Sequence, residues 1–262
     1  QQCMLCLTDC FLKKTVLFLT FTVLVCYEAY SQRPNIIYIM SDDMGYGDLS
    51  GYGHKSHATH NLDRLASQGV KFVNAYSAGA VCTPTRTALM TGRYPARTPI
   101  GLMEPLTPTK KDSAVGLTEE YPSVASLMKA VGYETALIGK WHLGFLPQHN
   151  PTKNGFDYFF GFLSGAADYL SYKAGPEGHR AHDLYENSTP VHPEGYLTDL
   201  FSQKAVAFIK QKHSKPFFLT LTYNAPHWPW LGPNDQPYAD SVDFRKGGSA
   251  ATYAAMIKRL DE

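Results

Sequence analysis

The chain has 262 residues, with 24 Lys and Arg against 23 Asp and Glu, and its formal net charge at pH 7 is +1 with neutral histidines. This length suffices for one sizeable α/β domain with a buried core. The near balance of charges gives no support for a nucleic-acid partner or an acidic membrane partner.

Residues 1–31 are expected to be an export signal with some upstream sequence. Two lysines precede the apolar run 15–26, and small residues suited to signal cleavage follow it. A buried or membrane-anchoring helix is the alternative, but the run is short for a membrane span. We therefore expect a periplasmic or secreted protein with no stable membrane span after cleavage, and a mature domain over 32–262.

Export would leave Cys82 as the one cysteine of the mature chain, because the other four of the five cysteines lie within the signal region. An exported protein with a single cysteine has no intramolecular disulfide partner for it. A lone cysteine is often a small buried hydrophobe. The alternative is a chemically special position.

Short apolar runs alternate with helical patterns along the rest of the chain. Strands are predicted at 35–40, 70–75, 135–138 and 216–223, the first of them buried on both faces. Helices are predicted at 59–69, with Asn61 near the N-cap, and at 121–131 and 201–212. The stretches 98–116 and 171–194 are expected to be surface loops that line a cleft. This alternation predicts a mostly parallel sheet covered by helices.

Polar side chains follow three of the predicted strands. Asp42 and Asp43 follow the first, Lys140 and His142 follow the third, and His227 lies just beyond the last. Ligands bind beyond the carboxyl ends of strands in open α/β sheets, so these residues are expected at one site. Adjacent carboxylates there suit Ca²⁺ or Mg²⁺. Taken singly, the aspartate pair is more typical of a turn and the others of ordinary hydrogen-bonded residues.

The stretch AVCTPTRTALMTGR, residues 80–93, adds an anion-binding feature. Thr83 is predicted to be the N-cap of a helix with Pro84 at its first position. Cys82 then lies at a helix N-terminus, where the macrodipole favours negative charge. Arg86 can point back towards residue 82 or towards a bound anion. Together with the strand ends, this describes a site for an oxyanion ester.

At these residues the chain resembles the sulfatase family of the alkaline-phosphatase-like superfamily. Residues 80–92 match its Cys-x-Pro-x-Arg signature, and residues 132–142 match its second signature. The resemblance implies an alkaline-phosphatase-like α/β fold, a mostly parallel sheet between helices, that hydrolyses sulfuric esters. It also implies that a maturation enzyme oxidises Cys82 to formylglycine, an aldehyde that hydrates to a diol.

The resemblance assigns the metal and the nucleophile to neighbouring residues. Asp42 and Asp43 would bind Ca²⁺, with the oxygen on residue 82 as a further ligand. One hydroxyl of the hydrated residue 82 would attack the sulfur of the ester.

The remaining roles implied by the resemblance fall to four side chains. Arg86 would stabilise the charged diolate and Lys140 would hold a sulfate oxygen. His227 would bind sulfate near the leaving oxygen and help to protonate it. His142 would take a proton from the second hydroxyl of residue 82, so that the aldehyde reforms and sulfate leaves.

One feature departs from the family pattern. The family completes its metal site with an Asp-Asn pair on a later strand, and no such segment occurs in this sequence. Residues 253–262 are expected to lie in the helix before that strand. We therefore expect the C-terminal part of the catalytic domain to be missing, and the chain alone to bind metal weakly and to hydrolyse esters poorly.

The substrate is constrained less than the reaction. Residues 155–161 resemble the arylsulfatase B-like branch, which acts on sulfated amino sugars. Aromatic residues expected near the mouth favour a sulfated glycan over a small aryl or alkyl sulfate; they are Tyr169, Tyr172, Trp228 and Trp230. The alternatives are a phosphate mono- or diester hydrolase on the same fold and a non-catalytic protein that binds sulfated glycans.

Overall fold

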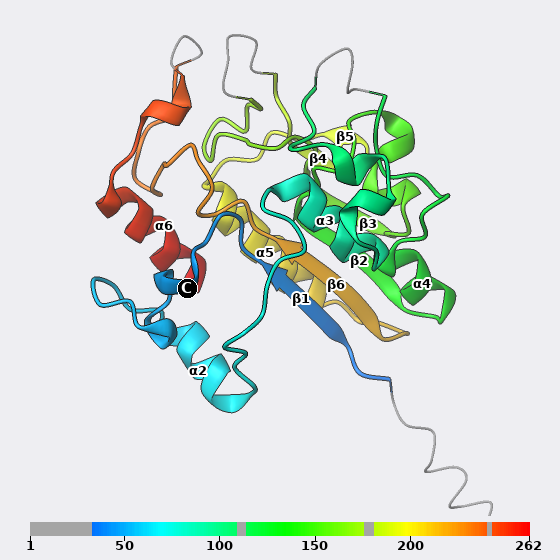
Figure 1. The fold of residues 1–262 in the computed structure, drawn as a ribbon, viewed down its shortest axis with the longest axis horizontal. Coiled ribbons are helices and arrows are strands. Elements are labelled where there is room, and N and C mark those ends of the chain that lie inside the picture. Colours follow the sequence, from blue (N-terminus) through cyan, green and yellow to red (C-terminus); the bar gives the residue numbers. More distant parts are fainter. Residues whose placement is uncertain (1–32, 109–113, 176–180, 240–242) are drawn as a thin grey trace, which may run out of the picture. The chain divides into compact units, whose positions relative to one another are not determined.

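Six strands form one sheet in the computed structural model, which describes residues 33–108, 114–175, 181–239 and 243–262. All of these strands belong to the unit Asn35–Glu262. The predicted export signal lies outside the described residues. The predicted α/β class is confirmed, because helices connect strands that are mostly parallel (Figure 1).

The order of the strands in the sheet is β1-β6-β2-β3-β4-β5. Parallel pairing joins β1 to β6, β6 to β2 and β2 to β3, whereas β4 and β5 add an antiparallel hairpin at the far edge. The bounds are β1 Ile36–Met40, β2 Glu134–Lys140, β3 Tyr158–Phe162, β4 Tyr185–Glu186, β5 Thr189–Pro190 and β6 Phe217–Thr222. Three parallel neighbours, β1, β6 and β2, therefore end at the same edge of the sheet.

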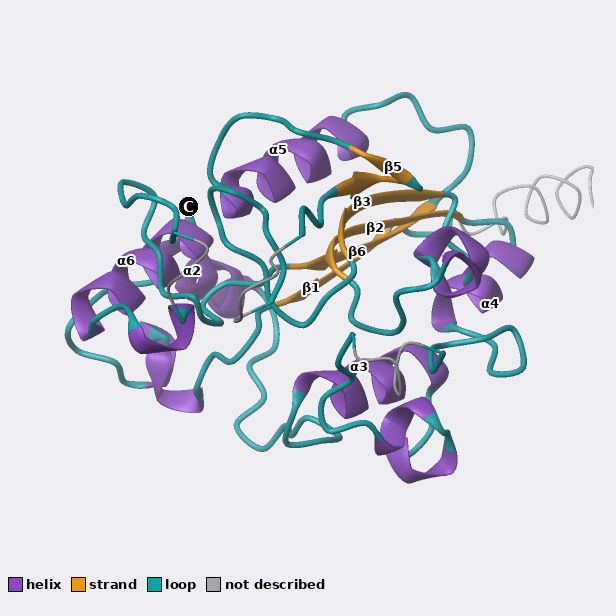
Figure 2. Ribbon diagram, turned by 90° about the horizontal axis from the view of Figure 1, so that it is seen from above, coloured by secondary structure: helices purple, strands orange, loops and turns teal. Residues whose placement is uncertain are grey.

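Helices cover both faces of this sheet (Figure 2). The helix α5 lies on one face, and α3 and α4 lie on the other. The α-helices are α2 His60–Gln68, α3 Cys82–Thr91, α4 Val124–Ala130, α5 Leu197–Ile209 and α6 Ala250–Asp261. Short 3-10 helices occupy Tyr46–Asp48, Ser50–Tyr52, Pro95–Arg97, Ile100–Leu102, Pro147–His149, Pro151–Lys153 and Phe244–Lys246. No described helix is both long and apolar enough to cross a membrane.

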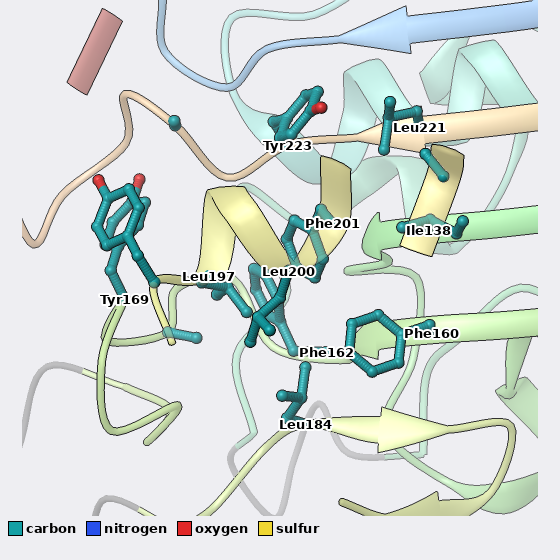
Figure 3. Close-up of a cluster of buried hydrophobic side chains, with 14 of the residues drawn as sticks. Ile138, Phe160, Phe162, Tyr169, Leu184, Leu197, Leu200, Phe201, Leu221 and Tyr223 are labelled. Carbon is teal, nitrogen blue, oxygen red and sulfur yellow. The ribbon is translucent and has the colours of Figure 1, made fainter. Parts of the chain in front are cut away.

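Alternation along the strands divides the core into two clusters, one on each face. Towards α5, Phe201 is fully buried and its ring stacks on Phe162 with centroids 6.3 Å apart (Figure 3). Towards α3 and α4, Leu137 and Phe159 pack with Met90. Burying one such large side chain contributes about 1.5–3 kcal/mol. The two clusters hold the strands rigidly from both sides.

The predicted strands are confirmed at β1, β2 and β6, but two other expectations are wrong. Residues 70–75 form no strand, since their apolar side chains, such as Val70 and Phe72, are exposed and pair with nothing in the sheet. The strand β1 is an edge strand rather than one buried on both faces, and Ile39 is 55% exposed. Neither β3 nor the hairpin inside 171–194 was predicted as a strand.

The helices are where the patterns indicate, with shifted boundaries. The helix α4 begins after Ser123, whose side chain accepts a hydrogen bond from Ser126 N, rather than at 121. The helix α5 begins four residues before the predicted start at 201. The N-cap of α2 is Thr59, and Asn61 lies inside that helix. The predicted loop 98–116 contains a short helix with Ile100 buried, so part of it belongs to the core.

The start of α2 is held by the end of α6, which lies beside it (Figure 1). The Asp261 carboxylate accepts hydrogen bonds from Asn61 N at 3.0 Å and Leu62 N at 2.8 Å. These amides have no intrahelical acceptor, and the carboxylate also suits the positive end of the helix dipole. A residue 200 positions away in the sequence thus caps α2.

Replacing Asp261 by alanine is expected to lower the free energy of unfolding by about 1–2 kcal/mol, the usual cost of losing an N-cap. Urea unfolding measures the change. The matched control is Glu262→Ala, which removes a neighbouring carboxylate paired only with the surface side chain Arg259 and should cost less than about 1 kcal/mol. An equal decrease in the free energy of unfolding for the two variants would contradict the capping role of Asp261.

Candidate active site

The carboxyl ends of β1, β6 and β2 bring together the polar residues that the sequence places after these strands. Asp42 N donates to Ala225 O at 3.0 Å, which joins the segment after β1 to the segment after β6. Lys140 is the last residue of β2, and its ammonium donates to the Asp42 carboxylate. The prediction that these strand ends meet is confirmed.

A buried cluster of three charged side chains forms the centre of the site. Asp42 Oδ1 lies 3.5 Å from Arg86 Nη2, while Asp42 Oδ2 accepts from Lys140 Nζ. Burial opposes ionisation of Asp42, but the positive charges of Lys140 and Arg86 outweigh it and hold the pKa of the carboxyl well below its usual range. Two positive charges against one negative charge leave this cluster cationic.

Arg86 retains unused hydrogen-bonding capacity. Its Nη1 donates to Lys140 O at 2.7 Å, which fixes the guanidinium against the end of β2. Its Nε and Nη2 are buried without a hydrogen-bond partner. Nη2 is 3.5 Å from Asp42 Oδ1, which is an ion pair without a hydrogen bond. Buried donors normally have hydrogen-bond partners, so these two donors on a buried cation indicate a place for an anionic acceptor.

Close backbone approach at the end of β2 requires glycine. A Cβ on Gly139 would lie 1.9 Å from Thr222 O, and one on the paired Gly161 would lie 1.8 Å from Gly139 O. Gly139 also has a φ of +118°. Thr222 completes the arrangement, because its hydroxyl donates to Lys140 O at 2.8 Å. The three strands are therefore packed tightly just where the cationic cluster begins.

Asp43 faces the site from its outer side. Its φ is +60° and its side chain is 56% exposed, unlike the buried Asp42 beside it. His227 Nε2 lies 3.6 Å from Asp43 Oδ2. Burial, together with the charge of Lys140, lowers the pKa of His227. A neutral imidazole and a solvent-facing carboxylate thus border the cationic cluster.

His142 is buried and held in one tautomer. Its Nε2 donates to Leu106 O at 2.8 Å, so Nδ1 carries the lone pair, and Nδ1 is buried without a partner. Burial, reinforced by the charge of Lys140, lowers the pKa of His142 well below its usual value. Its φ of +56° is unusual for a non-glycine residue. His142 is therefore a neutral, fixed proton acceptor.

Cys82 is the first residue of α3, with Val81 as the N-cap. The predicted cap by Thr83 is wrong: Thr83 is buried inside the helix, and its Oγ1 accepts from Leu106 N at 3.0 Å. The Leu106 peptide thus bonds to both α3 and His142, and sequence reasoning gave it no role. Cys82 is a free, partly buried thiol at the positive end of the helix.

The residues present fit part of a calcium shell. Asp42 and Asp43 offer carboxylate oxygens, and Asn224 Oδ1 is buried without a hydrogen-bond partner. Ca²⁺ prefers about 6–8 such oxygen ligands. Within the described residues, no group of three or more His, Cys, Asp or Glu side chains is placed to hold a metal. The donor chemistry is that of a hard cation, while the number of donors is small.

Two of the aromatic residues expected at the mouth belong to the core instead. Tyr169 is fully buried, and its hydroxyl donates to Asn224 O and His227 O, both at 2.9 Å. Tyr172 is 5% exposed, and its hydroxyl donates to Gly195 O. The Tyr169 hydroxyl therefore holds the backbone of the loop that carries His227. Because the Tyr169 ring is fully buried, a substrate has no access to it.

The family model Sulfatase matches residues 34–262 of this chain. Human N-acetylgalactosamine-6-sulfatase is 38% identical over 245 residues, which cover 88% of this chain and 45% of the relative. Arylsulfatase J of Mus musculus is 35% identical over 89% of this chain and 39% of its own length. The chain thus spans less than half the length of these two curated relatives.

Solved structures resemble this chain over most of its length. The crystal structure of Ps i-CgsB in complex with k-i-k-neocarrahexaose has a TM-score of 0.74 at 34% identity, covering 88% of this chain and 53% of that chain. The structure of BT4656 in complex with its substrate D-glucosamine-2-N,6-O-disulfate has a TM-score of 0.61 at 32% identity, covering 77% of this chain and 36% of that chain.

Proposed function

The chain belongs to the sulfatase family, and on that premise we propose that the protein hydrolyses sulfate esters at the carboxyl edge of its sheet. The observation that carries this proposal is the buried cluster of Arg86, Lys140 and Asp42, which is cationic and has unpartnered donors. A sulfate ester supplies the anionic oxygens that such donors need.

The nucleophile in this proposal is residue 82 after oxidation of Cys82 to formylglycine by a maturation enzyme. The hydrated aldehyde supplies one hydroxyl, which loses its proton to water as its oxygen attacks sulfur. The proton of the second hydroxyl is then removed, so that the aldehyde reforms and sulfate is expelled. Cys82 is the first residue of α3, and its neighbour Thr83 accepts a hydrogen bond from Leu106 N. This bond holds the start of the helix in place, which supports the role of residue 82. When bound by Asp42 and Asp43, Ca²⁺ would supply positive charge to the sulfate oxygens.

Binding and proton transfer are assigned to the other side chains. Arg86 and Lys140 hold sulfate oxygens with charge-assisted hydrogen bonds. His227 is neutral in the resting site, and its Nδ1 donates to Trp228 O, so its Nε2 first takes up a proton from water. It then donates this proton to the leaving oxygen as the bond between sulfur and that oxygen breaks. His142 accepts a proton at Nδ1 from the second hydroxyl of residue 82, because its Nε2 is already committed to Leu106 O.

We propose a sulfated glycan as the substrate class. One solved relative is in complex with k-i-k-neocarrahexaose and another with its substrate D-glucosamine-2-N,6-O-disulfate, and the human relative is an N-acetylgalactosamine-6-sulfatase. We also propose export to the periplasm or outside the cell. That proposal rests on the run 15–26, which lies outside the described residues.

The test of this function compares two fluorogenic esters, 4-methylumbelliferyl sulfate and 4-methylumbelliferyl phosphate, with chain that carries the aldehyde at residue 82. We expect slow release, because the described residues offer few metal ligands, with the sulfate ester cleaved faster than the phosphate ester. Cys82→Ala should reduce release to background, since no nucleophile remains. Faster cleavage of the phosphate would favour a phosphate ester hydrolase, and binding of sulfated glycans without release would favour a binding protein.

A further inference from the structure

A cavity of about 340 Å³ lies between the loop after β1 and the first turn of α6. Its lining includes His54, His57, Trp230, Ser249, Tyr253 and Ala254. The volume is within the range of about 300–1,000 Å³ that small-molecule sites occupy. We call it the aromatic pocket. The proposed reaction uses none of these residues.

Two pairs of rings border the aromatic pocket. The rings of His54 and His57 have their centroids 3.9 Å apart, with the ring planes tilted by 35°. Trp230 and Tyr253 meet edge to face, with centroids 6.3 Å apart and planes at 88°. Flat, weakly polar rings of this kind pack against apolar faces. Both nitrogens of His54 already have partners, whereas His57 Nδ1 is buried without one and can hydrogen-bond to a ligand. A sugar ring presents both kinds of surface.

The walls of the aromatic pocket contact the segments that carry two residues of the candidate active site. Tyr253 Oη donates to Asp48 Oδ2 at 2.6 Å and lies 3.3 Å from Asp43 O. Trp230 Nε1 donates to Pro226 O at 3.1 Å, one residue before His227. Tyr253 therefore contacts the segment that carries Asp43, and Trp230 contacts the segment that carries His227, which makes the pocket a neighbour of the site.

The charges beside the aromatic pocket select against an anionic occupant. The Asp48 carboxylate accepts a hydrogen bond from the Tyr253 hydroxyl, and a carboxylate at that position repels a second sulfate group. The cationic charge of the site is instead concentrated at Arg86 and Lys140. An extended substrate would therefore place its sulfate at the cluster and an uncharged part at the pocket.

We propose that the aromatic pocket binds an uncharged sugar ring, a neighbour of the sulfated unit in a glycan substrate. This inference rests on the proposed function for the identity of the ligand. It assigns a positioning role to Trp230 and Tyr253, which would orient the glycan so that its ester reaches residue 82.

The test uses uncharged probes, so that binding is measured independently of sulfate chemistry. Methyl β-D-galactopyranoside and methyl N-acetyl-β-D-galactosaminide are titrated into the full chain, and tryptophan fluorescence is followed because Trp230 lines the pocket. The blocking variant is Ala254→Phe, which fills the pocket from α6. The matched control is Ala251→Phe on the same helix, where the side chain is exposed.

We expect saturable binding of at least one glycoside by the wild-type chain and by Ala251→Phe, and at least tenfold weaker binding by Ala254→Phe. Circular dichroism should show the same fold for both variants. The inference is overturned if the wild-type chain binds neither glycoside, or if Ala254→Phe binds as well as the control. If the wild-type chain binds a glycoside but does not cleave 4-methylumbelliferyl sulfate, the proposed hydrolysis is contradicted and the pocket is not, because that small ester does not need the pocket.

Discussion

The tryptic peptide 72–86 is expected to carry an aldehyde or its hydrate at residue 82 when the chain is synthesised together with a formylglycine-generating enzyme. The same enzyme added to purified, folded chain is expected to leave a thiol at this position. Mass spectrometry of the peptide distinguishes the two results. The prediction follows from the proposed role of Cys82 and from the burial of the residues around it.

Burial is the physical reason for the difference between the two conditions. Pro84 lies inside α3, where it is buried, and Arg86 is 3% exposed. An enzyme that reads the Cys-x-Pro-x-Arg signature needs contact with these side chains. In the folded chain that contact would require unwinding α3 and breaking the hydrogen bond from Arg86 to Lys140 O. Only a chain that has not yet folded offers the signature.

A matched pair of variants tests whether the maturation enzyme recognises the Cys-x-Pro-x-Arg signature. Arg86→Lys should reduce conversion during synthesis, whereas Arg93→Lys, an exposed residue outside the signature, should leave it unchanged. A thiol under both conditions, with a control sulfatase converted in the same cells, would make Cys82 an ordinary small residue. Equal conversion of folded and nascent chain would contradict the argument from burial.

The central part of the site was predictable from the sequence because of a property of parallel strands. Asp42, Lys140 and His227 each follow or end an apolar run, and parallel strands end at one edge of the sheet, so the three residues were expected at that edge. They meet there because β1, β6 and β2 are neighbours in the sheet. The family resemblance added their roles, which geometry alone leaves open. What could not be predicted was the environment of each group. The local sequence, for example, does not indicate which of the adjacent residues Asp42 and Asp43 is buried and which is exposed.

The wrong predictions share a cause, which is that burial is decided by neighbours distant in the sequence. The run 36–40 has the composition of a central strand, yet β1 lies at the edge of the sheet and is exposed. Tyr169 was expected near the mouth of the site, yet it is buried and its hydroxyl contacts residues after β6. The Leu106 peptide, which joins α3 to His142, carries no sequence signal because its backbone makes the bonds.

Replacing Asp42 by asparagine is expected to lower the free energy of unfolding by about 3–5 kcal/mol, the usual cost of breaking a buried ion pair from one side. Lys140 and Arg86 would remain buried with two positive charges and no carboxylate between them. The amide of asparagine can still accept a hydrogen bond, but it cannot neutralise either charge.

Asp43→Asn is the matched control, because it makes the same chemical change one residue further along the chain. The Asp43 side chain is 56% exposed, and its Oδ2 lies 3.6 Å from Nε2 of the neutral His227 ring. We expect a cost below about 1 kcal/mol for this exposed carboxylate. Urea unfolding of both variants with a metal chelator present removes any contribution of bound cation from the comparison. If Asp42→Asn costs no more than Asp43→Asn, the buried cluster does not depend on Asp42 for charge balance. The site would then tolerate two unpaired cations in its resting state, and Arg86 and Lys140 would not need a sulfate as their anionic partner.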